Sequence, residues 1–261
     1  MTAGTSREAA APVRSGTDDP SQSGRARTVN VELPFRDRKV AGERLADAVA
    51  AWLATVPSTA GRAGLTEVAP AGDVLVLGIP RGGVVVAAEV ARALPARLDI
   101  LVAHKIGAPE DPEFAIGAVT ADGTVLVASW AAGETGLKPD SIQVLAEREI
   151  RLAREREGRL RAGRPPLSVA GSIAILVDDG LATGSTVHAA VLAARALGAA
   201  RVVVAAPVAS REAVALLEPV ADAVVVVLVP ARFHAVGQWY ASFDQVSDDV
   251  VRSLLAADAG P

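Results

Sequence analysis

The sequence predicts an α/β fold in which a mainly parallel, twisted sheet carries helices on both of its faces. From Val74 onward, short apolar runs alternate with stretches whose apolar residues recur at helical spacing, and this alternation is typical of parallel sheets with crossover helices. The runs are apolar throughout, as expected for strands buried on both sides. The 261 residues are 51% hydrophobic and 21% charged, so the chain is long and apolar enough for a sizeable core.

The first expected elements precede this core. Residues 1–30 are rich in Ser, Thr, Gly, Ala and Pro and lack apolar periodicity, which predicts a disordered tail. In the stretch FRDRKVAGERLADAVAAWL, which starts at Phe35, apolar residues recur at helical spacing and Asp37 is placed to act as the N-cap. We therefore expect a helix there, followed by a link that contains Gly, Thr and Pro and reaches about Gly72.

The core elements then follow in a regular order. Val, Ile and Leu dominate the predicted strands, Ala-rich periodic stretches form the predicted helices, and the pair Asp122-Gly123 marks a hairpin turn. In chain order, the sequence predicts a strand at 74–79, a helix at 82–94, a strand at 98–105, a hairpin over 115–129, a helix at 141–161, a strand at 172–177, a helix at 185–198, a strand at 201–208, a helix at 211–217 and a strand at 223–229.

Half of the eight aromatic residues gather in a short segment after Pro230, namely Phe233, Trp239, Tyr240 and Phe243. Such a cluster predicts a core or dimer contact, and a platform for a planar base is the alternative. The segment ends in an acidic helix start, SDDVVRSLL. We expect residues 31–261 to form one domain, with a small hood built from about 31–70 and 230–261.

Composition excludes several kinds of partner. The net charge of −4 gives no general attraction to nucleic acid or anionic membranes, and the Arg-rich helix over 148–164 alternates with Glu, which predicts a solvated face. Without cysteine, the chain has neither disulfides nor thiolate chemistry. The longest apolar run, Ala223 to Ala231, is too short to cross a bilayer, and the N-terminus lacks a secretory signal pattern. We therefore expect a cytoplasmic protein without nucleic-acid or membrane partners.

The stretch ILVDDGLATGST, residues 175–186, combines two acids with a loop of small and hydroxyl-bearing residues. Asp178 and Asp179 lie at the carboxyl end of a predicted strand, where ligands bind in open α/β sheets. The following loop runs into a helix, so its N–H groups and the helix dipole favour a phosphate. Carboxylates accept hydrogen bonds from vicinal hydroxyls. A ribose 5-phosphate satisfies both demands, with its hydroxyls on the acids and its phosphate in the loop.

This stretch resembles the phosphoribosyl pyrophosphate (PRPP) motif of type I phosphoribosyltransferases, in which two acids and a Thr-Gly-x-Thr loop follow an apolar strand. The resemblance implies that Asp178 and Asp179 orient the ribose. It also implies that the 5-phosphate is bound by Ala182, Thr183, Gly184, Ser185 and Thr186. The alternative is a generic strand-turn-helix with a capping loop. The flanking stretches FRDRKVAG and VGQWYASFDQVSDD are similar to marks of one subgroup of this family.

A second stretch, GIPRGGV at 78–84, resembles the pyrophosphate loop of the same family. Gly82 and Gly83 expose backbone N–H groups, and Arg81 offers a guanidinium fork for phosphate oxygens. A tight strand-to-helix turn is the alternative. Lys105 ends the strand predicted over 98–105, where related enzymes carry a basic residue near the pyrophosphate; a solvated strand end is the alternative.

One departure from the family concerns the segment 106–137, which contains no Lys or Arg and is acidic. Several type I enzymes cover the pyrophosphate with a basic mobile loop, and this segment cannot neutralise pyrophosphate in that way. Either Lys105, Arg81 and Mg²⁺ suffice, or Lys138 or a partner subunit's arginine contributes, or transfer is slow. The segment's acids at 110, 111 and 113 either serve a base or a second metal or form a solvated loop face.

The resemblance implies transfer of the 5-phosphoribosyl group from PRPP to a nitrogen nucleophile, a base or related amine, with release of pyrophosphate. The expected catalytic residues are Asp178, Asp179, Arg81 and Lys105. The expected cofactor is Mg²⁺, held by pyrophosphate and ribose oxygens and reached by the two acids through water. Type I relatives are often dimers, so a homodimer is expected. The main alternative is a non-catalytic PRPP- or nucleotide-sensing regulator; a phosphatase or hydrolase of phosphorylated ribosides is a third.

Overall fold

The computed structural model describes residues 33–56, 74–94, 96–111, 115–127 and 131–258, so the tail predicted over 1–30 lies outside it. Its centre is a five-stranded parallel sheet with strand order β2-β1-β6-β7-β8. These strands are β1 (Val74–Gly78), β2 (Arg97–Ile100), β6 (Ile173–Val177), β7 (Arg201–Val208) and β8 (Ala223–Leu228). The parallel α/β fold expected from the sequence is confirmed.

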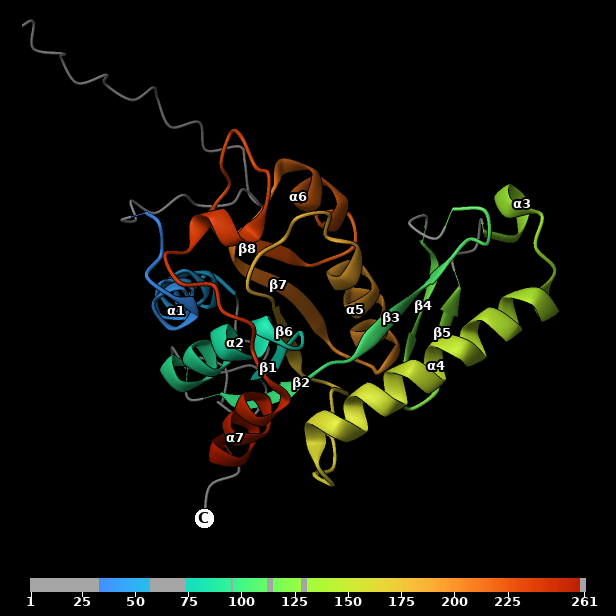
Figure 1. The fold of residues 1–261 in the computed structure, drawn as a ribbon, viewed down its shortest axis with the longest axis horizontal. Helices are drawn as coiled ribbons and strands as arrows, with labels where there is room; N and C mark the ends of the chain where they lie inside the picture. The colour runs from blue at the N-terminus through green and yellow to red at the C-terminus, as the bar shows by residue number, and fades with distance from the viewer. Residues whose placement is uncertain (1–32, 57–73, 95, 112–114, 128–130, 259–261) are drawn as a thin grey trace, which may run out of the picture.

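Helices cover both faces of this sheet (Figure 1). One face carries α1 (Arg38–Leu53), α2 (Gly82–Ala93) and α7 (Asp248–Asp258), and the other carries α5 (Ser185–Ala196) and α6 (Arg211–Leu217). Side chains alternate between the two layers along each strand: Val76 packs toward α1 and α2, whereas Leu77 packs toward α5. All five residues of β1 are buried, which explains why the strands read as continuous apolar runs.

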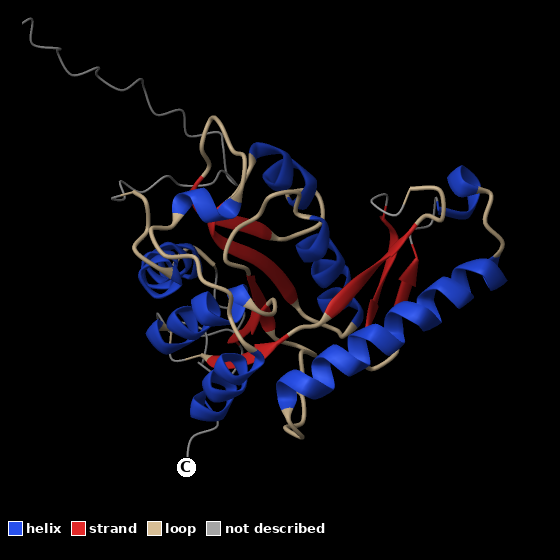
Figure 2. Cartoon of the chain, viewed as in Figure 1, coloured by secondary structure: helices blue, strands red, loops and turns tan. Residues whose placement is uncertain are grey.

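A second, three-stranded antiparallel sheet forms an arm beside the central sheet (Figure 2). It contains β3 (Ala103–Gly107), β4 (Ala115–Thr120) and β5 (Val125–Val127), and it packs against the long helix α4 (Pro139–Arg161); the short helix α3 (Ala131–Thr135) precedes α4. The hairpin expected at Asp122-Gly123 is present, since Thr120 N donates to Thr124 O at 3.1 Å and Gly123 has φ +99°.

The single strand expected over 98–105 is wrong, because the chain changes sheets within it. β2 runs beside β1 as far as Ile100, and Leu101 N still donates to Gly78 O at 3.3 Å. The chain then leaves the edge of the central sheet and enters β3 at Ala103. Leu101 and Val102 are buried at this crossing, so no polar residue or glycine marks the break in the sequence.

Most charged side chains of helix α4 are exposed, as its alternating charges predicted, but its C-terminal end is fastened by a buried contact. Arg161 is 8% exposed and pairs with Asp99 of β2, which is 1% exposed, at 2.6 Å. The same carboxylate accepts from Leu167 N at 2.7 Å, and Arg161 Nη2 donates to Ile100 O at 3.0 Å. A buried ion pair thus fastens the C-terminal end of α4 to the edge of the central sheet.

The segments that flank the core meet each other. Phe35 N donates to Trp239 O at 2.8 Å, and Ala241 N donates to Phe35 O at 2.7 Å. The rings of Phe35 and Tyr240 are 5.6 Å apart. Asp37 caps α1 as expected, its Oδ1 accepting from the amide of residue 40 at 2.9 Å. Within the described ranges, no helix is long and apolar enough to cross a membrane.

Candidate functional site

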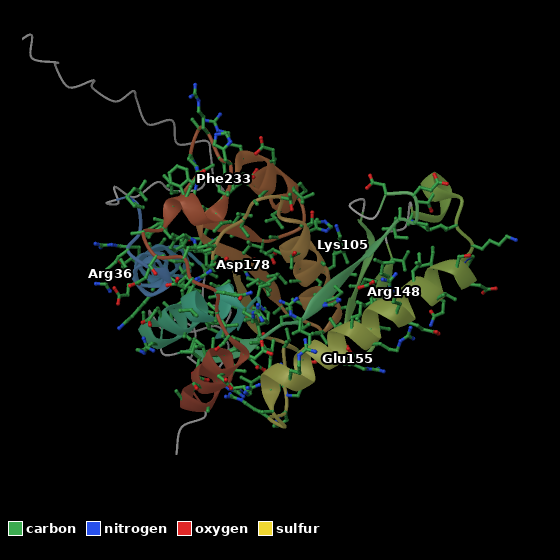
Figure 3. The ribbon with its side chains drawn as sticks, viewed as in Figure 1. Arg36, Lys105, Arg148, Glu155, Asp178 and Phe233 are labelled. Carbon is green, nitrogen blue, oxygen red and sulfur yellow. The ribbon has the colours of Figure 1, made fainter. Side chains whose placement is uncertain are left out.

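Asp178 and Asp179 follow β6 directly, at the carboxyl edge of the central sheet (Figure 3). Asp178 is half-buried, and its Oδ1 accepts from Asp179 N at 2.8 Å. Burial raises the pKa of Asp178 well above its ordinary value, and the negative charge of Asp179 adds to this rise. The two neighbouring carboxylates therefore repel each other and cost the fold free energy, and such an arrangement is typical of a site that binds a ligand.

The glycine loop that follows β1 lies in contact with these acids. A Cβ at Gly82 would lie 1.8 Å from Asp179 Oδ2, and one at Gly83 would lie 2.5 Å from Val177 O and 2.8 Å from Asp178 Cα. Backbone atoms block a side chain at Gly83, whereas a side chain at Gly82 would displace the carboxylate of Asp179. The structure thus brings together the two motifs that sequence reasoning assigned to ribose and to pyrophosphate.

Arg38, from the first turn of α1, reaches the second acid. Its Nε donates to Asp179 Oδ2 at 2.7 Å, with the two side chains 12% and 15% exposed. The guanidinium also lies 3.9 Å from the ring centroid of Phe243, and its Nη1 donates to Asp244 O at 2.7 Å. One residue thus links the N-terminal helix, the acid pair and the C-terminal segment.

The aromatic segment after Pro230 also touches the acid pair. The Tyr240 hydroxyl donates to Asp179 O at 2.5 Å. Burial and the nearby charge of Asp179 raise the pKa of Tyr240 far above its ordinary value, so this phenol stays a donor. Its ring lies 4.9 Å from that of Phe243, which is 37% exposed. The cluster therefore contributes to the core at Tyr240 and to the site at Phe243.

The loop after the acids forms the start of α5, as its sequence predicted. Leu181 N donates to Val208 O at 2.9 Å, and Ser210 Oγ donates to Ala182 O at 2.6 Å, which ties the loop to the end of β7. Gly184 has φ +77° and precedes the first helical residue. The loop side chains at 183, 185 and 186 are exposed or half-buried. The first amides of the helix have no intrahelical acceptor, so the loop retains the character of an anion cradle.

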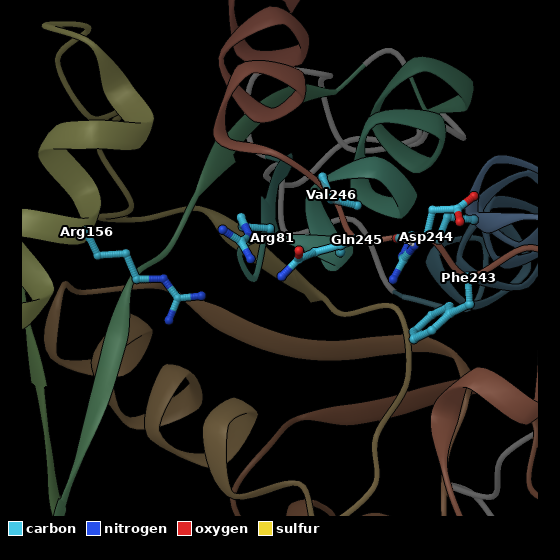
Figure 4. A pocket seen from close by; sticks show the side chains of 8 residues that line it. Arg81, Arg156, Phe243, Asp244, Gln245 and Val246 are labelled. Carbon is cyan, nitrogen blue, oxygen red and sulfur yellow. Dashed lines mark hydrogen bonds between the residues drawn. The ribbon is translucent and has the colours of Figure 1, made fainter.

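A pocket of about 420 Å³ opens in front of the glycine loop, and its lining comes from four parts of the chain: Arg38, Arg81, Gly82, Arg156, Phe243, Asp244, Gln245 and Val246. Three of these side chains are guanidiniums. Figure 4 shows Arg81 and Arg156 reaching into the same space from different elements. The pocket is therefore strongly cationic at the end next to the glycine loop.

Lys105 does not lie where the sequence placed it. It belongs to β3 and pairs with Ala118 of β4, so it does not end a strand of the central sheet (Figure 3). Because the chain changes sheets after Ile100, Lys105 is carried onto the arm and does not contribute to the lining of the pocket. Of the acids that precede β4, Glu110 and Asp111 are exposed, and residue 113 lies outside the described residues.

Sequence reasoning missed two residues of the pocket, Arg38 and Arg156. The pair Arg38–Asp179 spans 141 positions in the chain, and the contact between Arg156 and Pro80 spans 76. Neither separation leaves a local pattern. For Arg38 the available signal is the pair of arginines in FRDRKVAG, which the sequence marks as a helix start and as a stretch similar to one subgroup of the family.

Similarity to known proteins agrees with this geometry. The model of the phosphoribosyl transferase domain family matches residues 42–240. Two proteins from two strains of Mycobacterium tuberculosis, each provisionally named a phosphoribosyl transferase, are 44% identical over 182 residues. That match covers 70% of this chain and 41% of each relative, so the chain spans about two fifths of their length.

Among solved structures, the protein TT1426 from Thermus thermophilus superposes with a TM-score of 0.76 at 41% sequence identity. The match covers 87% of this chain and 100% of that chain. The acid pair, the glycine loop and the anion cradle all lie inside the region matched by the family model. The chain belongs to the phosphoribosyltransferase domain family.

Proposed function

We propose that this protein transfers the 5-phosphoribosyl group of PRPP to a nitrogen nucleophile and releases pyrophosphate. The observation that supports this most directly is the contact between the acid pair and the glycine loop, where a Cβ at Gly82 would lie 1.8 Å from Asp179 Oδ2. A ribose held by the acids would have its anomeric carbon beside a pyrophosphate held by the loop. In PRPP the anomeric carbon carries the pyrophosphate, so a site for PRPP needs these two subsites side by side.

The roles of the residues follow from this placement. Asp178 and Asp179 accept hydrogen bonds from the ribose hydroxyls, and the loop over 182–186 binds the 5-phosphate with its amides and hydroxyls. Arg81 and the amides of Gly82 and Gly83 bind the pyrophosphate. The bond from C1 to the pyrophosphate oxygen breaks with its electrons leaving on pyrophosphate. The acceptor nitrogen supplies the electron pair for the new bond and then loses a proton. Catalysis is positioning and charge stabilisation.

The acids fit a magnesium ion that arrives with the substrate. Among the described residues, no group of three His, Cys, Asp or Glu side chains could hold a metal. Asp178 and Asp179 alone offer two carboxylates, and Mg²⁺ commonly combines one or two carboxylates with phosphate oxygens and waters. When bound, the ion neutralises negative charge on the pyrophosphate. The two acids would hold the ion through water.

A homodimer is a prediction from the family resemblance.

The acceptor side of the pocket comes from segments that flank the family match. Arg38 precedes residue 42, and Phe243 and Gln245 follow residue 240, whereas Arg81 and Arg156 lie between these limits. The pocket therefore combines residues of the shared domain with residues outside it, and Arg38 reaches the glycine loop, 3.0 Å from a Cβ built at Gly82. We propose that these flanking segments form a hood that selects the acceptor.

Calorimetry with PRPP and Mg²⁺ tests the pocket. We expect binding by the wild type and its loss, by about 10-fold or more, in the double variant Asp178→Asn/Asp179→Asn, because each lost charge-assisted bond is worth about 1.5 kcal/mol or more. Unchanged binding by this variant would contradict the proposal. Release of pyrophosphate is then assayed with a panel of bases and amines, to identify the acceptor.

A PRPP-sensing regulator is the second candidate, and the Arg38–Asp179 pair favours it. A ribose that takes Asp179 must compete with a 2.7 Å ion pair whose cation also contacts Phe243 and Asp244. Ligand binding would thereby be coupled to the C-terminal segment. Tight PRPP binding without pyrophosphate release for any acceptor would support the regulator over the transferase.

A further inference from the structure

We infer that Arg156 of α4 is a pyrophosphate-binding residue, which together with Arg81 forms a two-guanidinium clamp. This inference rests on the proposed function and answers a question left open by the sequence. The segment 106–137 has no Lys or Arg with which to cover pyrophosphate, and Lys105 lies on the arm. A second cation from elsewhere in the chain would fill this gap.

The position of Arg156 satisfies this need. Its Nη2 donates to Pro80 O at 2.6 Å, so the guanidinium lies against the residue that precedes Arg81 in the glycine loop. Arg156, Arg81 and Gly82 line one pocket (Figure 4). A diphosphate seated on the amides of Gly82 and Gly83 would have one guanidinium from the loop and one from α4. Guanidinium forks match phosphate oxygens in charge and in geometry.

The charge balance around Arg156 favours an anion. Among the described residues, Arg156 has no carboxylate within ion-pair distance, whereas the neighbouring Arg159 and Arg161 pair with Asp248 and Asp99. Burial lowers the pKa of Arg156, and the positive charges of Arg81 and Arg159 lower it further. The negative charges of Asp248, which lies 3.4 Å from Arg81, and of Asp178 offset this excess only in part. A bound anion would relieve the repulsion between these guanidiniums.

Two anchors hold α4 on either side of Arg156, so this cation is positioned before the ligand binds. Arg154 Nε donates to Ala121 O at 2.8 Å, which ties the helix to the hairpin. Arg161 lies about one and a half turns beyond Arg156 and is fastened to Asp99 by the buried ion pair. In this protein the clamp is therefore carried by an anchored helix, and binding does not have to order a loop.

Calorimetry on four proteins separates ligand binding from a structural role: the wild type, Arg156→Gln, Arg156→Lys and the control Arg151→Gln, whose side chain is exposed on the same helix. The ligands are PRPP and pyrophosphate, each with Mg²⁺, and ribose 5-phosphate. We expect Arg156→Gln to weaken the binding of PRPP and of pyrophosphate by roughly 10- to 100-fold. Arg156→Gln should bind ribose 5-phosphate with the affinity of the wild type. Arg156→Lys should have intermediate affinities for PRPP and pyrophosphate, and the control should have the affinities of the wild type.

Several results would overturn the inference. One is an unchanged affinity of Arg156→Gln for PRPP. Another is an equal loss for all three ligands together with a lower unfolding temperature, because that is the result of a general loss of structure and not of a lost contact with pyrophosphate. If the Gln variant does not fold, Arg156→Lys carries the same test, since it keeps the charge and loses the fork. A wild type that binds no PRPP would refute the proposed function itself, and with it this inference.

Discussion

The carboxylate of Asp178 is half-buried beside a second carboxylate. From its raised pKa we predict how the stability of the fold depends on pH. A raised pKa means that the folded chain binds this proton more tightly than the unfolded chain does. The resulting stabilisation is present below about pH 4, the ordinary pKa of Asp, and is lost as the pH rises through the folded pKa. Above the folded pKa, the ionised Asp178 therefore destabilises the fold.

Asp178→Asn should accordingly raise the midpoint of thermal unfolding by about a few degrees at pH values above the folded pKa of Asp178, while it weakens PRPP binding. The Asn oxygen can still accept from Asp179 N, so the local hydrogen bond is kept. The gain should shrink as the pH is lowered toward about 4. Thermal unfolding measured over a pH series checks this, and a gain that is the same at every pH would contradict the assigned cause.

Asp179→Asn should have the opposite effect on stability, although the two acids are adjacent. Arg38 is 12% exposed and pairs with Asp179 at 2.7 Å, so this substitution leaves a largely buried guanidinium without its carboxylate. We expect a loss of about 1 to 3 kcal/mol of unfolding free energy in urea titrations at neutral pH. Equal stabilities of the two Asn variants would contradict the distinct environments of the two acids.

At this scale, local patterns in the sequence predicted one part of the site and missed another. The acid pair and the glycines at 82 and 83 follow strand ends closely, so the predicted strands were enough to place them. The partners of the acids did not follow, because Arg38 and Arg156 come from other elements. Lys105 was misplaced for a related reason: its position depends on a break between strands that apolar residues conceal.

Among the elements, α4 depends most on a single contact. Asp99→Ala would remove the buried partner of Arg161, which keeps Glu157 at 2.5 Å and Ile100 O at 3.0 Å, and would leave Leu167 N without its acceptor. We expect a loss of about 3 kcal/mol of unfolding free energy, since a buried ion pair and a buried hydrogen bond are lost together. PRPP affinity should fall as well, because Arg156 lies on the same helix. Urea unfolding and calorimetry measure the two effects.

An exposed ion pair on another helix provides the control. Arg92 is 62% exposed and pairs with Glu89 of α2. Arg92→Ala should change the unfolding free energy by less than about 1 kcal/mol. If Asp99→Ala costs no more than this control, α4 is not anchored by the buried pair.

The extents of most elements could be predicted from the sequence. The helix expected over 211–217 and the strand over 201–208 agree with α6 and β7, because each has strong periodicity and clear boundaries. The antiparallel arm was not foreseen as a separate sheet. Its strands were recognised as a hairpin, but nothing in the local pattern showed that β3 had left the central sheet to join them.

At the scale of the whole molecule, the segments before and after the core pack against each other through Phe35 and Tyr240. Phe35 is 1% exposed and Tyr240 is 6% exposed, with their rings 5.6 Å apart. Phe35→Ala should cost about 3 to 5 kcal/mol of unfolding free energy. In a double-mutant cycle with Tyr240→Ala, the two losses should be coupled by about 0.5 to 1.5 kcal/mol. Additive losses would show that the two rings contribute independently.

The link between Arg38 and the far end of the chain has a consequence for synthesis on the ribosome. Arg38 is among the first residues of the core to be translated, whereas its contacts Asp179, Phe243 and Asp244 come much later. Folding during translation proceeds from the N-terminal side. A chain that stalls before Phe243 would contain both acids and the glycine loop, yet lack the segment that positions Arg38 against Asp179. The complete lining of the pocket can therefore form only after residues 243–246 have been made.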